Sequence, residues 1–331
     1  MRPLIFETLA TGIVAFVLTF LSIPPLMRKL RAAGIVGIDV HKLSHPEIPE
    51  MGGLAILLGF GGSMLAAMFL LPEYQVVFAS VLLSVLVAGA VGVVDDLRGL
   101  GPKEKPLLLI LAGLPILALG VYNPFLRLPI VGPTRLFFVY PLLVLIAVSV
   151  VANAVNMLDV YNGSMPATCI PVTVVLFTAS LLSGDSAGAA MSLGLMSILI
   201  AFYWYNRFPA KLFSGNVGSL AVGAALVGIA IGARLEVVAL VAMMPHIMNA
   251  FHILKSVGGI MEKGQMGARP TVLLEDESLA VNLKAGAPLT LAGLVLAKGP
   301  MTESQTVKVF AALAVYSGIL ALVTYFTIPL G

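Results

Sequence analysis

The sequence has little charge and almost no cysteine. Charged residues make up 11% of its 331 residues, against about 25% in an ordinary soluble domain. Hydrophobic residues make up 59% and continue along nearly the whole chain, so no stretch is polar enough for a separate soluble domain. These properties predict an all-α, polytopic integral membrane protein with one domain over residues 1–331.

The scarce polar residues exclude further classes. Cys169 is the single cysteine, so the chain can form no internal disulfide and gives no indication of a redox function. Apolar runs separate the 19 Lys and Arg residues, which excludes nucleic-acid binding as a main function. Outside helix-spaced positions the four histidines show no metal-like pairing, and we interpret them as structural or rim residues. They are His41, His45, His246 and His252.

Ten apolar runs are long enough to cross a bilayer core of about 30 Å. The predicted spans are 4–27, 53–71, 76–94, 106–122, 136–153, 167–183, 187–205, 218–233, 236–254 and 308–328. The first run is too long for a signal peptide and lacks a cleavage pattern, so we expect it to remain in the protein. The more polar segment 255–307 is the natural place for a substrate-handling loop.

Basic residues are concentrated on one side of this predicted topology. Loops 28–52, 95–105, 154–166, 206–217 and 255–307, with Lys308, hold 15 Lys and Arg residues. The opposite side has only Arg2, Arg127, Arg135 and Arg234. The positive-inside rule therefore places the first set in the cytosol and both termini outside. The same face carries 12 of the 16 acidic residues, an excess that the rule does not explain.

Two carboxylates, Asp95 and Asp96, close the third predicted span. Adjacent carboxylates repel each other unless a cation shares them, which indicates Mg²⁺ or a phosphate-linked proton. A solvated helix end is the alternative. Lys105 opens the next span, where a lysine can bind phosphate or extend to lipid headgroups.

Amide side chains mark two further segments. Asn153, Asn156 and Asp159 recur every three residues and fall near one helix face, as residues lining a wet cavity or a ligand do. Residues 213–219 place glycines on both sides of Asn216 before an apolar run. Such a turn is typical of anion binding at a helix N-terminus, although a plain connecting turn fits equally well.

In this order and spacing the motifs resemble the polyprenyl-phosphate N-acetylhexosamine-1-phosphate transferases. The motifs are Ile48-Pro49-Glu50 with Gly52-Gly53, Asp95-Asp96 with Lys105, the run 153–163, and the run 213–219. The resemblance spans about residues 10–330. Within the family the chain looks closer to dolichyl-phosphate GlcNAc-1-phosphate transferases of archaea and eukaryotes than to the bacterial phospho-MurNAc-pentapeptide translocase. It has Gly267-Ala-Arg269-Pro-Thr where that translocase has a His-rich signature.

The resemblance implies transfer of a sugar phosphate from a UDP-sugar to a polyprenyl or dolichyl phosphate, with release of UMP. It also implies Mg²⁺, with Mn²⁺ as an alternative. The expected location is the cell membrane, or the endoplasmic reticulum membrane in a eukaryote, with the active site on the cytosolic face. The sequence is compatible with a homodimer and leaves the exact sugar and lipid open.

The resemblance, together with a hypothesis of our own for Asp159, gives individual residues expected roles. Expected catalytic residues are Asp95, Asp96, Lys105 and Asp159. Expected metal ligands are Asn156, Asp159 and Asn216. Expected substrate-binding residues are Lys42, Glu50, Asn153, Asn162, Gly163 and Arg269.

Asn216 departs from the family, whose motif has Asp as a metal ligand at this position. An amide oxygen can coordinate Mg²⁺ but brings no charge. Three explanations stay open: Asp159 restores the missing charge, the chain is an inactive substituted form, or it is a natural homologue with altered chemistry. We take the first as the working hypothesis.

Two other classes of function remain open. A secondary transporter should show inverted repeats and helix breaks near the membrane midplane, whereas the ionisable residues here gather at one boundary. A non-catalytic homologue would bind lipid phosphate or UDP-sugar without turnover, and the Asn216 departure favours it over the transporter.

Overall fold

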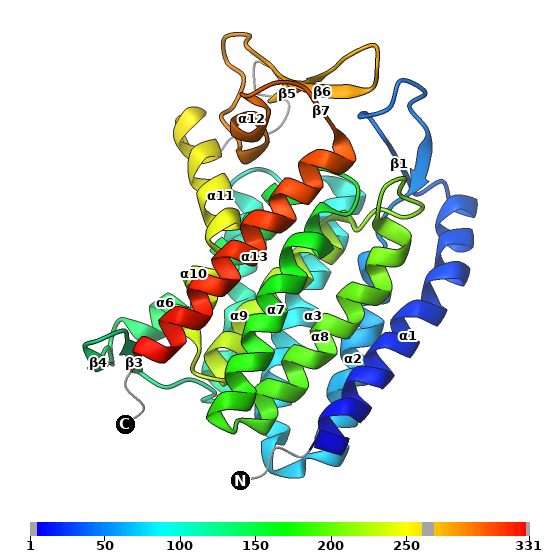
Figure 1. Cartoon of the computed structure of the whole chain (residues 1–331). Coiled ribbons are helices and arrows are strands. Elements are labelled where there is room, and N and C mark those ends of the chain that lie inside the picture. Colours follow the sequence, from blue (N-terminus) through cyan, green and yellow to red (C-terminus); the bar gives the residue numbers. More distant parts are fainter. Residues whose placement is uncertain (1–4, 260–267, 329–331) are drawn as a thin grey trace.

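The computed structural model describes residues 5–259 and 268–328 and shows a bundle of long helices (Figure 1). Its α-helices are α1 (Ile5–Ala32), α2 (Gly53–Leu70), α3 (Gln75–Arg98), α4 (Glu104–Ile110), α5 (Leu114–Ala118), α6 (Tyr140–Leu158), α7 (Ser164–Ser183), α8 (Ser186–Asn206), α9 (Gly215–Gly232), α10 (Glu236–Ala242), α11 (Met244–Ser256), α12 (Leu291–Leu296) and α13 (Glu303–Thr327). Two 3₁₀ segments are η1 (Pro72–Tyr74) and η2 (Leu111–Gly113). The predicted polytopic, mostly helical membrane protein is confirmed.

Short strands join some of the helices. They are β1 (Val36–Ile38), β2 (Glu47–Pro49), β3 (Phe125–Leu128), β4 (Gly132–Arg135), β5 (Thr271–Leu273), β6 (Ser278–Val281) and β7 (Met301–Thr302). β1 pairs with β2 and β3 with β4, each antiparallel, and β5, β6 and β7 form a three-stranded antiparallel sheet. The predicted loop 255–307 therefore contains this sheet and α12, and its residues 260–267 lie outside the described part of the chain.

Eight described helices are long and apolar enough to cross a membrane, and α10 with α11 adds a ninth span that bends by 68°. The fourth predicted span, 106–122, is not one helix. It is divided into α4, η2 and α5, with Gly113 and Pro115 near the breaks. Glycine and proline interrupt helices because of backbone entropy and a missing N–H donor, respectively.

Helix α9 is the centre of the bundle, since 83% of its membrane window is buried against 28% of that of α1. Small residues allow this burial. A Cβ atom on Gly223 of α9 would lie 2.5 Å from Cα of Ala152 in α6, so the two backbones approach as small residues permit in membrane helices. Large apolar side chains on the outer helices, such as Leu21 and Phe69, are exposed as lipid contact requires.

The two ends of the bundle differ. The start of α1, the end of α13 and the β3–β4 hairpin lie at one end, and the β5–β6–β7 sheet with α12 lies at the other (Figure 1). Helix α13 begins beside this sheet, where a capping box of Thr302 and Gln305 starts it. Helix α6 extends to Leu158, beyond the predicted 153, and so includes Asn153 and Asn156.

Candidate active site

The ammonium of Lys105, on α4, lies among oxygen atoms from three other helices. Its Nζ is 2.8 Å from Oδ2 of Asp95 on α3. It also donates to Oδ1 of Asn156 on α6 at 3.0 Å and to Oδ1 of Asn216 on α9 at 2.7 Å. Asn156 in turn donates to Asn216 Oδ1 and to Ser219 Oγ, both at 2.8 Å. We call these five residues the Lys105 cluster.

Asp96 fixes the start of α9 beside this cluster. Its Oδ1 accepts hydrogen bonds from the backbone and side-chain nitrogens of Asn216, both at 2.8 Å, and its Oδ2 accepts one from Val217 N at 3.0 Å. A carboxylate at a helix N-terminus satisfies unpaired N–H groups and is stabilised by the helix dipole. The adjacent carboxylates thus differ: Asp95 pairs with Lys105 and also accepts from Leu100 N at 2.8 Å.

Two glycines make this approach of α3 and α9 possible. A Cβ atom on Gly92 would lie 2.4 Å from Cα of Val217, closer than any real contact. Gly215 has a φ of +68°, a left-handed conformation that glycine adopts without strain. A Cβ atom there would also lie 2.5 Å from Oδ2 of Asp96. The Asp95-Asp96 motif and the 213–219 run are therefore parts of one contact between α3 and α9.

A second lysine, Lys42, lies among carboxylates in the loops. Its ammonium pairs with Glu303 at the start of α13, is 3.5 Å from Oδ2 of Asp39, and lies 4.1 Å from the ring centre of Phe208. Asn162 donates from its backbone to Glu303 at 2.6 Å and from its side chain to Asp39 at 3.0 Å. We call Asp39, Lys42, Asn162 and Glu303 the Lys42 cluster.

Two aromatic residues border the Lys42 cluster. The rings of His41 and Tyr161 are 4.8 Å apart. Burial lowers the pKa of His41 to about 4, against an opposing effect of Asp39, and burial raises the pKa of Tyr161 to about 12. Asp39, His41 and Glu303 place possible metal-ligand atoms within 4.8 Å of one another. However, Lys42 already supplies a cation to both carboxylates.

Asp159 lies beside the turn that carries Asn216. Its carboxylate accepts hydrogen bonds from the hydroxyl of Ser214 and, at 3.5 Å, from that of Ser164. Asn153 donates to the carbonyl of Ser149, one turn back in its own helix, at 2.8 Å. The three-residue spacing therefore brings Asn156 into the Lys105 cluster, while Asp159 accepts hydrogen bonds from two serines beside it.

The remaining predicted residues lie around these clusters. Gly163 precedes α7 with a φ of +84°, and a Cβ atom there would lie 2.9 Å from the Tyr203 ring. The backbone of Glu50, just after β2, donates to Ile35 O at 3.1 Å. Arg269 is exposed just before β5, and its carbonyl accepts from Asn282 at 2.8 Å. The Gly267 that precedes it in the motif lies outside the described residues.

Glu303, Ser214 and Ser219 received no role from the sequence. Glu303 fell in the predicted loop because the last span was predicted to start at 308, whereas α13 begins five residues earlier. The signal that could have placed it is the Thr302-x-x-Gln305 capping box, which marks a helix start. The two serines lie within the recognised 213–219 run, and only the packing shows which polar groups they contact.

Comparisons with known proteins agree with these motifs. The family model for glycosyl transferase family 4 matches residues 78–234. A protein of Methanocaldococcus jannaschii that is provisionally named a glycosyltransferase is 31% identical over 94% of both chains.

Two further relatives carry more specific names. A protein of Sulfolobus acidocaldarius, provisionally named UDP-N-acetylglucosamine–dolichyl-phosphate N-acetylglucosaminephosphotransferase, is 29% identical over 73% of this chain and 76% of its own length. The phospho-N-acetylmuramoyl-pentapeptide-transferase of Streptococcus pneumoniae is 29% identical over 76% of this chain and 81% of its own length.

Proposed function

Because this chain belongs to glycosyl transferase family 4, we propose that it transfers N-acetylglucosamine 1-phosphate, or a related N-acetylhexosamine phosphate, from a UDP-sugar to a polyprenyl or dolichyl phosphate. UMP is the second product. The name of the archaeal relative supports this donor and acceptor, and that of the streptococcal relative supports transfer of a phosphorylated N-acetylated sugar. The concentration of basic residues in the loops at the cluster end supports a cytosolic active site.

The observation that carries the proposal is the Lys105 cluster. Oxygen atoms from three other helices converge on one ammonium, and its partners include the oxygens of two neutral amides. Phosphoryl transfer requires charge neutralisation and in-line positioning, with little covalent work by the protein. A lysine that can exchange an amide oxygen for a phosphate oxygen supplies that neutralisation without breaking its ion pair with Asp95.

Lys105 and the two neighbouring aspartates have separate roles in this reaction. Lys105 binds the acceptor phosphate, and Asp95 holds Lys105 in place. Asp96 positions Asn216 through the start of α9. The lipid phosphate oxygen attacks the β-phosphorus of the donor, the bond from that phosphorus to the UMP oxygen breaks, and UMP leaves with the electron pair. A proton still on the lipid phosphate passes to Asp95 or Asp96.

The donor set also fits the magnesium ion on which this family generally depends. The oxygens of Asp95, Asn156 and Asn216 already converge on one cation, and carboxylate and amide oxygens are hard ligands of the kind that Mg²⁺ prefers. Asn156 and Asn216 would hold the ion, with Asp159 as the third ligand because its carboxylate accepts from Ser214, two residues before Asn216. The ion would neutralise the diphosphate of the donor.

The test is UMP release by purified protein in lipid with UDP-GlcNAc and dolichyl phosphate. We expect release that depends on the acceptor lipid and stops with EDTA, together with a GlcNAc-diphospholipid product. Nucleotide binding without UMP from any of several UDP-sugars would overturn the proposal and favour a non-catalytic homologue. Stoichiometric UMP release without lipid would instead indicate a two-step route through an aspartyl phosphate.

Asp159→Ala tests how the chain compensates for Asn216. We expect this variant to abolish Mg²⁺-dependent turnover, because it removes a carboxylate beside a turn that carries only an amide. The matched variant is Asn216→Asp. If Asp159 supplies the charge, the wild type should turn over without this substitution. Activity that survives Asp159→Ala, measured as EDTA-sensitive UMP release, would sink this explanation.

A further inference from the structure

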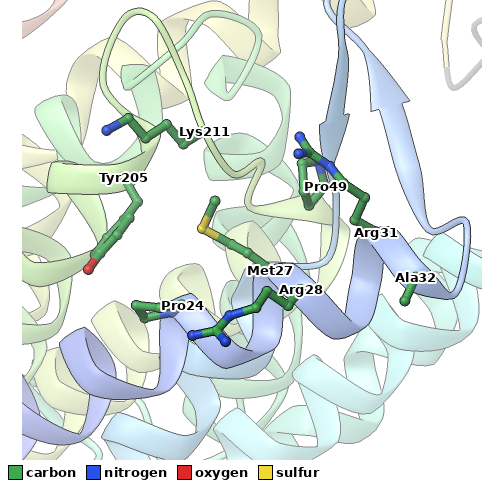
Figure 2. Close-up of a pocket in the computed structure, with 8 residues that line it drawn as sticks. All are labelled: Pro24, Met27, Arg28, Arg31, Ala32, Pro49, Tyr205 and Lys211. Atoms are coloured by element: carbon green, nitrogen blue, oxygen red, sulfur yellow. The ribbon is translucent and has the colours of Figure 1, made fainter.

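An open cavity of about 500 Å³ lies at the end of α1, on helices that the Lys105 cluster does not use. It is bordered by the last two turns of α1, by the end of β2, and by the end of α8 with the segment that follows it (Figure 2). Its lining residues are Pro24, Met27, Arg28, Arg31, Ala32, Pro49, Tyr205 and Lys211. We call this cavity the α1 pocket.

The polar part of the α1 pocket is positively charged. Arg28 and Arg31 are three residues apart, so they share one face of α1, and Lys211 enters from the segment after α8. Among the described residues, no carboxylate lines the pocket. Within residues 5–259 and 268–328, none of the three cations forms an ion pair. Figure 2 shows Met27 at the centre, with Lys211 on one side and Arg28 on the other.

The rest of the α1 pocket is apolar and continues into a lipid-facing stripe. Val17, Leu21, Pro24, Arg28 and Arg31 follow one another at spacings of four and three residues, which is one face of a helix. Val17 is 42% and Leu21 65% exposed. The cations thus stand where an apolar helix surface ends, the depth at which phospholipid headgroups meet acyl chains.

We propose that the α1 pocket binds an anionic phospholipid. The headgroup phosphate lies between Arg28, Arg31 and Lys211, and the acyl chains follow the exposed stripe of α1. Arginine forks and a lysine ammonium suit phosphate oxygens, and the apolar lining suits the glycerol and first methylenes. A free phosphate ion would gain nothing from that lining. The acceptor lipid of the proposed reaction is expected at the Lys105 cluster, on other helices.

Binding at this pocket should stabilise the segment that leads to α9. The backbone of Lys211 donates to Tyr205 O at 2.8 Å, and Phe213 N donates to Pro49 O at 2.8 Å. Pro49, Tyr205 and Lys211 line the pocket. Phe213 begins the turn that carries Asn216. Lipid that holds Lys211 therefore also holds this turn, which gives a thermal readout besides direct binding.

The experiment counts lipid adducts by native mass spectrometry on protein titrated with phosphatidylglycerol, phosphatidylcholine or dolichyl phosphate. Tm is followed in the same samples. The variant is Arg28→Gln/Arg31→Gln/Lys211→Gln. Each cation near a membrane surface changes lipid affinity about fivefold, so the triple variant should bind phosphatidylglycerol about 100-fold more weakly. Its lipid-induced rise in Tm should be lost as well.

The matched control is Lys29→Gln/Arg98→Gln/Lys103→Gln. It removes the same charge from exposed positions at the same end of the bundle that do not line the pocket. This control should bind within about twofold of the wild type. Millimolar inorganic phosphate should not displace the lipid, and Arg28→Gln alone should show about a fivefold loss.

Four results would overturn the proposal. They are equal losses in the triple variant and its control, equal binding of phosphatidylcholine and phosphatidylglycerol, displacement by inorganic phosphate, or tighter pocket-dependent binding of dolichyl phosphate than of phosphatidylglycerol. Because no arm measures turnover, failure here is independent of the proposed transferase function.

Discussion

The Lys105 and Lys42 clusters use the same kinds of side chain in opposite ways. The partners of Lys105 include a carboxylate and two neutral amide oxygens, each near the end of a membrane helix. Lys42 has two carboxylates, on Asp39 and Glu303, and it joins loops that are far apart in the sequence. The first lysine can exchange an amide for a ligand, whereas the second would leave two buried carboxylates unpaired.

This difference indicates a catalytic role for the Lys105 cluster and a structural role for the Lys42 cluster. Leaving a buried charge without its partner is costly, so the Lys42 cluster resists rearrangement. We therefore propose that Lys42, which resemblance assigns to substrate binding, acts by holding the 39–50 loop against α13 and Asn162. The Lys105 cluster remains the place where a phosphate replaces a protein ligand.

The largest expected effect comes from Lys105→Met. Removing one preorganised electrostatic partner of a reacting group costs up to about 10³-fold in rate. We expect a loss of that size in UMP release. Lys103→Met is the control, because Lys103 is exposed in the same segment, and it should keep the wild-type rate. A Lys105→Met rate within tenfold of wild type would contradict the assignment.

Lys42→Met should act on stability. It leaves Asp39 and Glu303 buried without their cation, a change that costs about 3–5 kcal/mol. We expect a clear fall in Tm in thermal scans of the protein in lipid. Adding Glu303→Gln should recover part of that loss, because one unpaired charge is removed. An unchanged Tm of Lys42→Met would show that the ion pair between Lys42 and Glu303 does not stabilise the fold.

The contact between α3 and α9 can be tested with a pair of glycines. Gly92→Ala places a methyl group against the Val217 backbone, and such overpacking costs about 1–3 kcal/mol. It should also lower turnover, because it moves Asp95 relative to Asn216. Gly61→Ala is the control, since its Cβ would meet nothing within 4 Å. Equal Tm values for the two variants would argue against close packing as the reason for Gly92.

The smallest effect concerns pH. The pKa of His41 falls from 6.5 unfolded to about 4 folded, beside Asp39, Lys42 and Arg269. Its contribution to stability is therefore complete above pH 6.5 and decreases as the pH falls through 6.5 towards 4, by up to about 3 kcal/mol. His41→Gln should flatten this part of the Tm curve between pH 7 and 4. A curve parallel to wild type would mean that other groups cause the acid sensitivity.

The sequence predicted much of this arrangement because the membrane imposes simple rules. Long apolar runs located the spans, and the polar motifs at their ends located Lys105, Asn156 and Asn216. What could not be predicted depends on contacts across the bundle. Asp95 pairs with Lys105 whereas Asp96 binds the start of α9, and no local sequence pattern predicts this difference. Nor does a local pattern predict that Lys42 pairs with Glu303, 261 residues away. The break of 106–122 into short helices follows from local glycine and proline, which a count of apolar residues overlooks.

The most direct test compares how much each of the two lysines contributes to the rate of UMP release per folded molecule. UMP release is measured side by side for Lys105→Met and for Lys42→Met/Glu303→Gln, with each rate divided by the folded fraction from gel filtration. We expect the double variant to stay within about tenfold of wild type while the rate of Lys105→Met falls by about 10³-fold. A Lys105→Met protein that turns over faster than the folded double variant would contradict the catalytic role of Lys105.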